Sequence, residues 1–176
     1  VCGTEGCTSH TGTIKHIADN SLNLVPNIAT NGATLTDGSY YLTDDLTLDN
    51  SKSLAINGTV NICLNGKTLT ARINIGEGAV LNICDCQGGG KIERLGNNAI
   101  VFKYNNGTAN IYGGTLVTNE DNVIVDLQDT TGNVLNLYGG TVSTGTNYAA
   151  IGIRTLVVNL YGGKITATDA NGIAVN

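Results

Sequence analysis

The chain has 176 residues and a formal net charge of −5, and it combines 24 glycines with only 5% aromatic residues and no Met or Trp. This length predicts one domain, and the scarcity of large apolar side chains argues against an all-α protein. The basic residues are scattered, so we expect no nucleic-acid partner. No apolar stretch approaches the about 20 residues that cross a bilayer, so we expect no membrane span.

Residues 1–39 contain the only Pro, both His and two of the five Cys, and they show no clear repeat. We predict that they form an N-terminal cap and lead-in, and that residues 40–176 form a repetitive domain. The sequence ends directly after the strand-like segment 172–175, without a polar capping segment. We therefore expect the repeats to continue in a longer natural protein, and the open C-terminal coil to pair with a second copy as a homo-oligomer.

One short phrase recurs along the repetitive part. Its copies begin at spacings of 21, 28, 26 and 23 residues, at Asn61, Asn82, Asn110, Asn136 and Asn159. Two further strand-like segments follow each of the later copies, as at 115–117 and 123–125. Three short strands per repeat predict an all-β fold, a single-stranded parallel β-helix or solenoid of roughly five to seven coils. We expect it to be right-handed, as parallel crossovers generally are.

The alternation of side chains along a strand assigns the two faces of the predicted coils. The inward column consists of Ile62, Ile83, Ile111, Leu137 and Leu160. The outward face then carries two columns. The first is the asparagine that opens each phrase, and the second, two residues later, contains Cys63, Cys84, Tyr112, Tyr138 and Tyr161.

The segments 111–115 (Ile-Tyr-Gly-Gly-Thr) and 137–141 (Leu-Tyr-Gly-Gly-Thr), together with 64–69 and 84–90, carry a resemblance to known proteins. They resemble the right-handed parallel β-helix repeats of large secreted surface proteins of Gram-positive, often gut-dwelling, bacteria. More loosely, they are similar to β-helical carbohydrate-binding modules. The resemblance covers residues 40–176 and implies an extracellular location, secreted or on the bacterial cell surface. It places no catalytic residue on this chain.

The aromatic column supplies the candidate ligand-binding residues, which are Tyr112, Tyr138 and Tyr161 with the neighbouring Asn110, Asn136 and Asn159. Phenol rings stack on sugars, and hydroxyl and amide groups hydrogen-bond to them. Identical side chains in register also stabilise a β-helix without any ligand. We expect a non-catalytic glycan-binding or adhesin module that binds a polysaccharide or host glycan and needs no cofactor. The alternatives are a purely structural stalk and a fragment of a polysaccharide lyase or hydrolase.

The five cysteines are candidates for disulfides or for a metal site. Cys63 and Cys84 share a register in adjacent coils, but a bridge between them would be strained. We favour disulfides from the cap to the first coils, formed by Cys2 or Cys7 with Cys84 or Cys86. The alternatives are free thiols and a tetrahedral Zn²⁺ site that takes its ligands from among Cys2, Cys7, His10, Cys84 and Cys86, whose spacing is not that of a standard zinc finger.

A column of charged residues is expected beside the third strand of each repeat. Lys103, Asp126 and Arg154 align across three coils if the residues that precede them point inward. Such a column predicts a surface salt-bridge ladder of small energetic value. It lacks the second carboxylate that an acid–base site needs.

Overall fold

The structure is a computed structural model. It describes residues 15–16, 33–42, 44–94, 98–119, 122–126, 130–145, 148–167 and 173–175. In this part of the chain every regular element is a β-strand, and no helix capable of crossing a membrane occurs there. All the strand pairings are parallel.

The strands form three sheets. Sheet 1 contains β1 (Lys15–His16), β3 (Gly38–Tyr41), β6 (Thr59–Cys63), β9 (Val80–Cys84), β12 (Thr108–Ile111), β15 (Val134–Leu137) and β18 (Val157–Leu160). Sheet 2 contains β4 (Leu46–Thr47), β7 (Thr68–Thr70), β10 (Lys91–Arg94), β13 (Thr115–Thr118), β16 (Thr141–Thr144) and β19 (Lys164–Ala167). Sheet 3 contains β2 (Ala33–Leu35), β5 (Ser53–Ile56), β8 (Arg72–Ile75), β11 (Ile100–Phe102), β14 (Ile124–Asp126), β17 (Ala149–Gly152) and β20 (Ile173–Val175).

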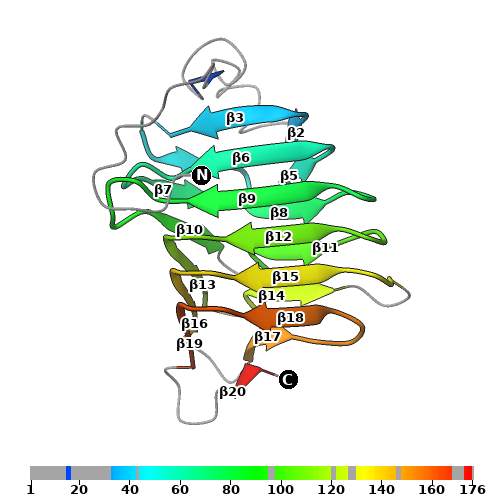
Figure 1. Ribbon diagram of the computed structural model, residues 1–176. Helices are drawn as coiled ribbons and strands as arrows, with labels where there is room; N and C mark the ends of the chain where they lie inside the picture. The colour runs from blue at the N-terminus through cyan, green and yellow to red at the C-terminus, as the bar shows by residue number, and fades with distance from the viewer. Residues whose placement is uncertain are drawn as a thin grey trace.

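The chain visits the three sheets in turn, as β6, β7 and β8 show, and then begins the next coil. The coils stack from the N-terminal to the C-terminal end (Figure 1). This arrangement confirms the predicted parallel β-solenoid, and sheets of seven, six and seven strands agree with the expected number of coils. Its handedness stays a prediction. The described solenoid already includes Ala33, within the segment predicted as cap and lead-in.

The core lies inside the coils because apolar residues alternate with polar ones along each strand. Four members of the predicted inward column, Ile62, Ile83, Ile111 and Leu137, are at most 1% exposed. The fifth, Leu160, is 58% exposed because β18 is the outermost strand of sheet 1 in the described chain.

After β12, β15 and β18, paired glycines form the corner between sheets 1 and 2. In each pair the second residue has a positive φ, of 85° at Gly114 and 80° at Gly140, a region that side chains rarely tolerate. The first residue has no room for a side chain at Gly139, because a Cβ atom there would lie 2.5 Å from the carbonyl oxygen of Tyr112. These corners follow Tyr112, Tyr138 and Tyr161, which lie at the same position in three successive coils.

The predicted surface column of Lys103, Asp126 and Arg154 is wrong. Strands β11 and β14 pair Phe102 with Asp126, so Asp126 belongs to the inward column and is fully buried. Its carboxylate accepts hydrogen bonds from the backbone N–H of Arg154 (2.9 Å) and of Thr155 (2.7 Å), and from the Thr155 hydroxyl (2.8 Å). Asp126 therefore fixes the turn after β17 instead of contributing to a surface ladder.

Candidate functional site

The asparagine column forms a continuous hydrogen-bonded ladder along sheet 1. Each Nδ2 donates to the Oδ1 of the preceding coil, at 2.7 Å from Asn82 to Asn61, 2.7 Å from Asn110 to Asn82, 2.8 Å from Asn136 to Asn110 and 2.9 Å from Asn159 to Asn136. The first member, Asn61, donates to the Ser39 hydroxyl at 2.9 Å. Each internal asparagine thus uses its carbonyl oxygen and one N–H within the ladder. A stabilising role is sufficient to explain this column.

The tyrosine ladder consists of Tyr112, Tyr138 and Tyr161. Consecutive ring centroids are 4.8 Å apart, and the ring planes differ by 5° and 8°. The rings therefore cover one another's faces, and mainly their edges and hydroxyl groups point outward. Tyr138 is 42% and Tyr161 is 66% exposed, whereas burial, followed by the charge of Tyr138, raises the pKa of Tyr112 above its usual value. The surface available to a ligand is a strip of ring edges and hydroxyls.

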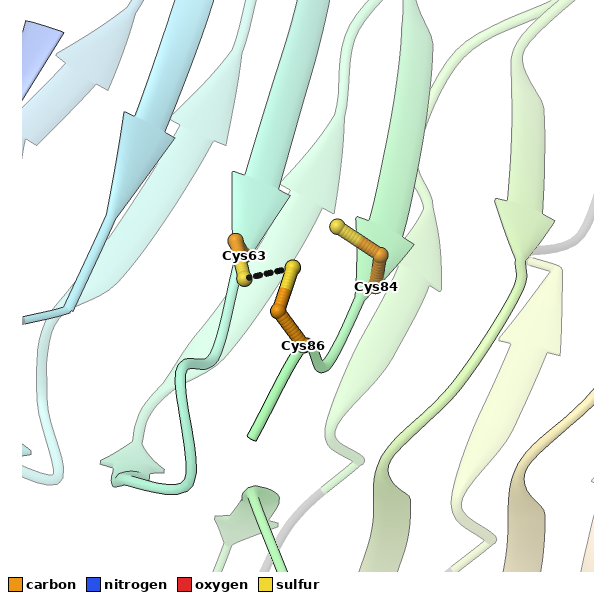
Figure 2. Close-up of side chains that lie close together, drawn as sticks. All are labelled: Cys63, Cys84 and Cys86. Atoms are coloured by element: carbon orange, nitrogen blue, oxygen red, sulfur yellow. Dashed lines mark hydrogen bonds between the residues drawn. The ribbon is translucent and has the colours of Figure 1, made fainter. Parts of the chain in front are cut away.

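Three cysteines gather where β6 and β9 end (Figure 2). Cys63 pairs in register with Cys84, as the sequence predicted, and Cys86 follows β9 by two residues. The Sγ atoms of Cys63 and Cys86 are 3.0 Å apart, and all three sulfur atoms lie within 4.8 Å of one another. All three residues are buried, and Tyr41 and Tyr112 pack against them. No two of these sulfurs are at bonding distance.

This cluster occupies the same column as the tyrosine ladder. Tyr41 pairs with Cys63, and Cys63 pairs with Cys84. Tyr112 comes next, because its backbone N–H donates to the carbonyl of Ile83, the residue before Cys84. Two thiols therefore interrupt a column that is otherwise aromatic, and Cys86 lies beside them.

Two turns hold the cysteines in place. After Cys63 the chain reverses at Asn65 and Gly66, which have φ values of 53° and 74°. Asp85 links this turn to the turn that follows β9. Its Oδ1 accepts a hydrogen bond from the backbone N–H of Gly66 at 2.7 Å, and its Oδ2 accepts one from that of Gly90 at 2.6 Å. The carboxylate between Cys84 and Cys86 thus fixes their loop to the coil that carries Cys63.

The surroundings of Cys63 favour its thiolate form. Its pKa falls to about 5, chiefly through a hydrogen bond with Cys84, while burial acts in the opposite direction. Cys86 and the backbone N–H groups of Cys86 and Asn65 lower the pKa further by hydrogen bonding to the same sulfur. This lowered pKa favours the thiolate of Cys63, with the Cys84 and Cys86 side chains hydrogen-bonded to it.

The sequence identified only part of this cluster. Cys84 and Cys86 were among the candidates for disulfides or metal, but Cys63 was paired only with Cys84, and its approach to Cys86 was not expected. The other candidates, Cys2, Cys7 and His10, lie outside the described residues. The sequence signal for this approach is the shared register of Cys63 and Cys84, because a turn directly after Cys84 can bring Cys86 back toward Cys63.

Comparison with known proteins gives no match to a family model, to a curated protein or to a solved structure. The parallel solenoid is shown by the strand pairing alone. The likeness to bacterial surface proteins and to carbohydrate-binding modules stays a prediction, as does the pairing of two copies through the C-terminal coil.

Proposed function

We propose that this chain is a non-catalytic glycan-binding or adhesin module of an extracellular protein, secreted or attached to a bacterial cell surface. The observation that carries the proposal is the tyrosine ladder: Tyr112, Tyr138 and Tyr161 share one register and are spaced by 4.8 Å. Tyr138 and Tyr161 remain exposed in a protein whose other apolar side chains are mostly buried. Exposed aromatic groups in line are characteristic of surfaces that bind partners.

The ring geometry determines how a glycan would bind. Because the rings stack on each other, a sugar would contact their edges and hydroxyls along the strip, and its ring could lie flat only on the outer face of Tyr161. Each hydroxyl both donates and accepts hydrogen bonds. A regular row of such groups suits a linear polysaccharide, whose hydroxyls also repeat, better than a single small sugar.

A purely structural stalk is the second candidate, and it is favoured by the way in which the two ladders satisfy themselves. The asparagines bond to each other from Asn61 to Asn159, and the tyrosines cover each other's faces. Both sets of contacts stabilise the solenoid without a ligand. The two candidates therefore require an experiment that separates the hydroxyls from the stacking.

The triple variant Tyr112→Phe, Tyr138→Phe and Tyr161→Phe keeps the stack and removes the hydroxyls. Its matched control is Tyr104→Phe with Tyr148→Phe, since these tyrosines are exposed to 49% and 47%, close to the 42% of Tyr138, but lie outside the ladder. The wild type and both variants are tested against arrays of plant, microbial and mucin glycans, and their melting temperatures are measured by circular dichroism.

The proposal predicts that the wild type and the control bind the same glycans and that the ladder variant loses affinity at an unchanged melting temperature. Equal binding by all three proteins would show that the hydroxyls do not contact the glycan. Silence of the wild type on every array would refute glycan binding by this chain and favour the stalk.

A further inference from the structure

The three sulfur atoms beside β6 and β9 lie close together (Figure 2), within 4.8 Å of one another. Cys63 and Cys84 approach it from adjacent coils, and Cys86 approaches it from the turn after β9. We propose that Cys63, Cys84 and Cys86 form a thiolate site for one Zn²⁺ ion. This proposal does not rest on the proposed glycan binding.

The spacing of the sulfurs fits this ion. Zinc binds thiolates at about 2.3 Å in a tetrahedral arrangement, which places the sulfur atoms about 3.8 Å apart. In the structure the Cys63 and Cys86 sulfurs are closer, at 3.0 Å, and no pair is farther apart than 4.8 Å. Side-chain rotations that move each sulfur by about 1 Å or less would bring the sulfur–sulfur distances to this tetrahedral value.

The charge of the site also favours zinc. All three side chains are buried, with exposures of 5, 8 and 6%. Zn²⁺ displaces the thiol protons to solvent when it binds, and the three thiolates so formed would repel one another and lack solvation without the cation. A divalent cation reduces their combined charge from −3 to −1, whereas a monovalent ion would leave −2. Soft sulfur ligands select zinc over calcium or magnesium.

The protein holds the ligands in advance. Asp85 ties the loop of Cys84 and Cys86 to the turn after Cys63 through the backbone of Gly66 and Gly90. Such outer contacts fix the orientation of metal ligands. Among the described residues, no His, Asp, Glu or further Cys joins these three, so these thiolates would supply three of the four positions of a tetrahedral zinc site.

The test uses the full chain, reduced and freed of metal under anaerobic conditions, and titrated first with Co²⁺ and then with Zn²⁺. We expect intense thiolate-to-Co²⁺ charge-transfer absorption that saturates at one ion per chain and disappears as Zn²⁺ displaces Co²⁺. Absence of this absorption in a chain whose thiols react quantitatively with a thiol reagent overturns the site. In that case we would instead expect the closest pair, Cys63 and Cys86, to form a disulfide.

Serine variants identify the ligands. Cys63→Ser, Cys84→Ser and Cys86→Ser are each expected to weaken Zn²⁺ binding by at least about tenfold, while the control Cys2→Ser with Cys7→Ser keeps the wild-type affinity. An equal loss in the control would overturn a site made of these three thiols.

Asp85→Asn keeps all three thiols and tests the site should a serine variant not fold. Because Asp85 positions the ligands without binding the metal, we expect this substitution to weaken Zn²⁺ binding about tenfold and to leave the wavelength of the Co²⁺ absorption unchanged. Wild-type affinity in this variant would contradict the positioning role, and a shifted absorption would show that the ligand set itself had changed.

Discussion

Removing one asparagine from the middle of the ladder tests whether the ladder stabilises the fold. Asn110 makes two ladder bonds, because its Nδ2 donates to Asn82 Oδ1 at 2.7 Å and its Oδ1 accepts from Asn136 Nδ2 at 2.8 Å. Asn110→Ala breaks both bonds and leaves a partly buried acceptor and donor without their ladder partners. Asn159→Ala breaks only one ladder bond, the donation to Asn136 Oδ1 at 2.9 Å, and is the matched control.

The expected magnitudes follow from the number of bonds. A hydrogen bond between neutral groups contributes about 1 kcal/mol net to stability. Asn110→Ala should therefore lower the free energy of unfolding by about 2 kcal/mol and Asn159→Ala by about 1 kcal/mol. The lost side chain is the same in both variants, so their difference isolates the second bond.

The measurement is equilibrium unfolding in urea, followed by far-ultraviolet circular dichroism and by tyrosine fluorescence, which is usable because the chain has no Trp. The two signals must change together for a two-state free energy to apply. Equal losses in the two variants, or a loss below about 0.5 kcal/mol for Asn110→Ala, which is typical of ordinary surface substitutions, would refute the ladder as a stabilising element.

Three further predictions concern other parts of the solenoid. Asp126→Asn places an amide N–H against backbone donors in a fully buried position, so we expect about 2 kcal/mol less stability in urea unfolding, and an unchanged midpoint would contradict the assigned contacts. Gly140→Ala should lower the melting temperature much more than Gly78→Ala, because both have positive φ but only at Gly140 would a Cβ meet backbone, at 2.6 Å; equal shifts would show that φ alone matters. The pKa of Tyr112 is raised in the folded chain, whereas an unfolded tyrosine ionises at about pH 10. The unfolded chain therefore loses this proton first, and stability falls as the pH rises from the unfolded pKa through the higher folded pKa. Phenolate absorbance that rises for every tyrosine together, before unfolding, would contradict this.

The regular part of the fold could be predicted from the sequence because each coil repeats the same physical pattern. The phrase that begins at Asn110 has an inward Ile111, an outward tyrosine and a glycine corner, and the next phrase repeats all three. The pattern of one coil alone would not decide how the strands are arranged, whereas the same pattern repeated in register over several coils indicates the stacked parallel solenoid. The register of Cys63 with Cys84 follows from the same pattern and is confirmed.

The errors occurred where the pattern is short or the chain leaves it. In β14 both Ile124 and Val125 are apolar, so alternation over three residues does not decide which one points inward, and the choice of Val125 placed Asp126 on the wrong face. The position of Cys86 depends on a turn instead of a strand. Its path is set by Asp85, which accepts one backbone hydrogen bond from Gly66 in the preceding coil and one from Gly90 in its own loop, and no local pattern indicates these contacts.

The two proposed sites share one column of side chains, and this arrangement explains why they can coexist. A cysteine side chain is much smaller than tyrosine, so the pair Cys63 and Cys84 leaves a gap in the column between Tyr41 and Tyr112, and the turn that carries Cys86 fills it. The coils on either side retain their rings. Tyr112 is the junction, because it packs against the thiols and also stacks on Tyr138 at 4.8 Å. Since contacts in a solenoid are made with neighbouring coils, changes at Tyr138 and Tyr161 affect the aromatic strip alone, whereas a change in the size of Tyr112 affects both sites. A phenylalanine at that position preserves both packings, which is why the hydroxyls can be tested separately from the metal.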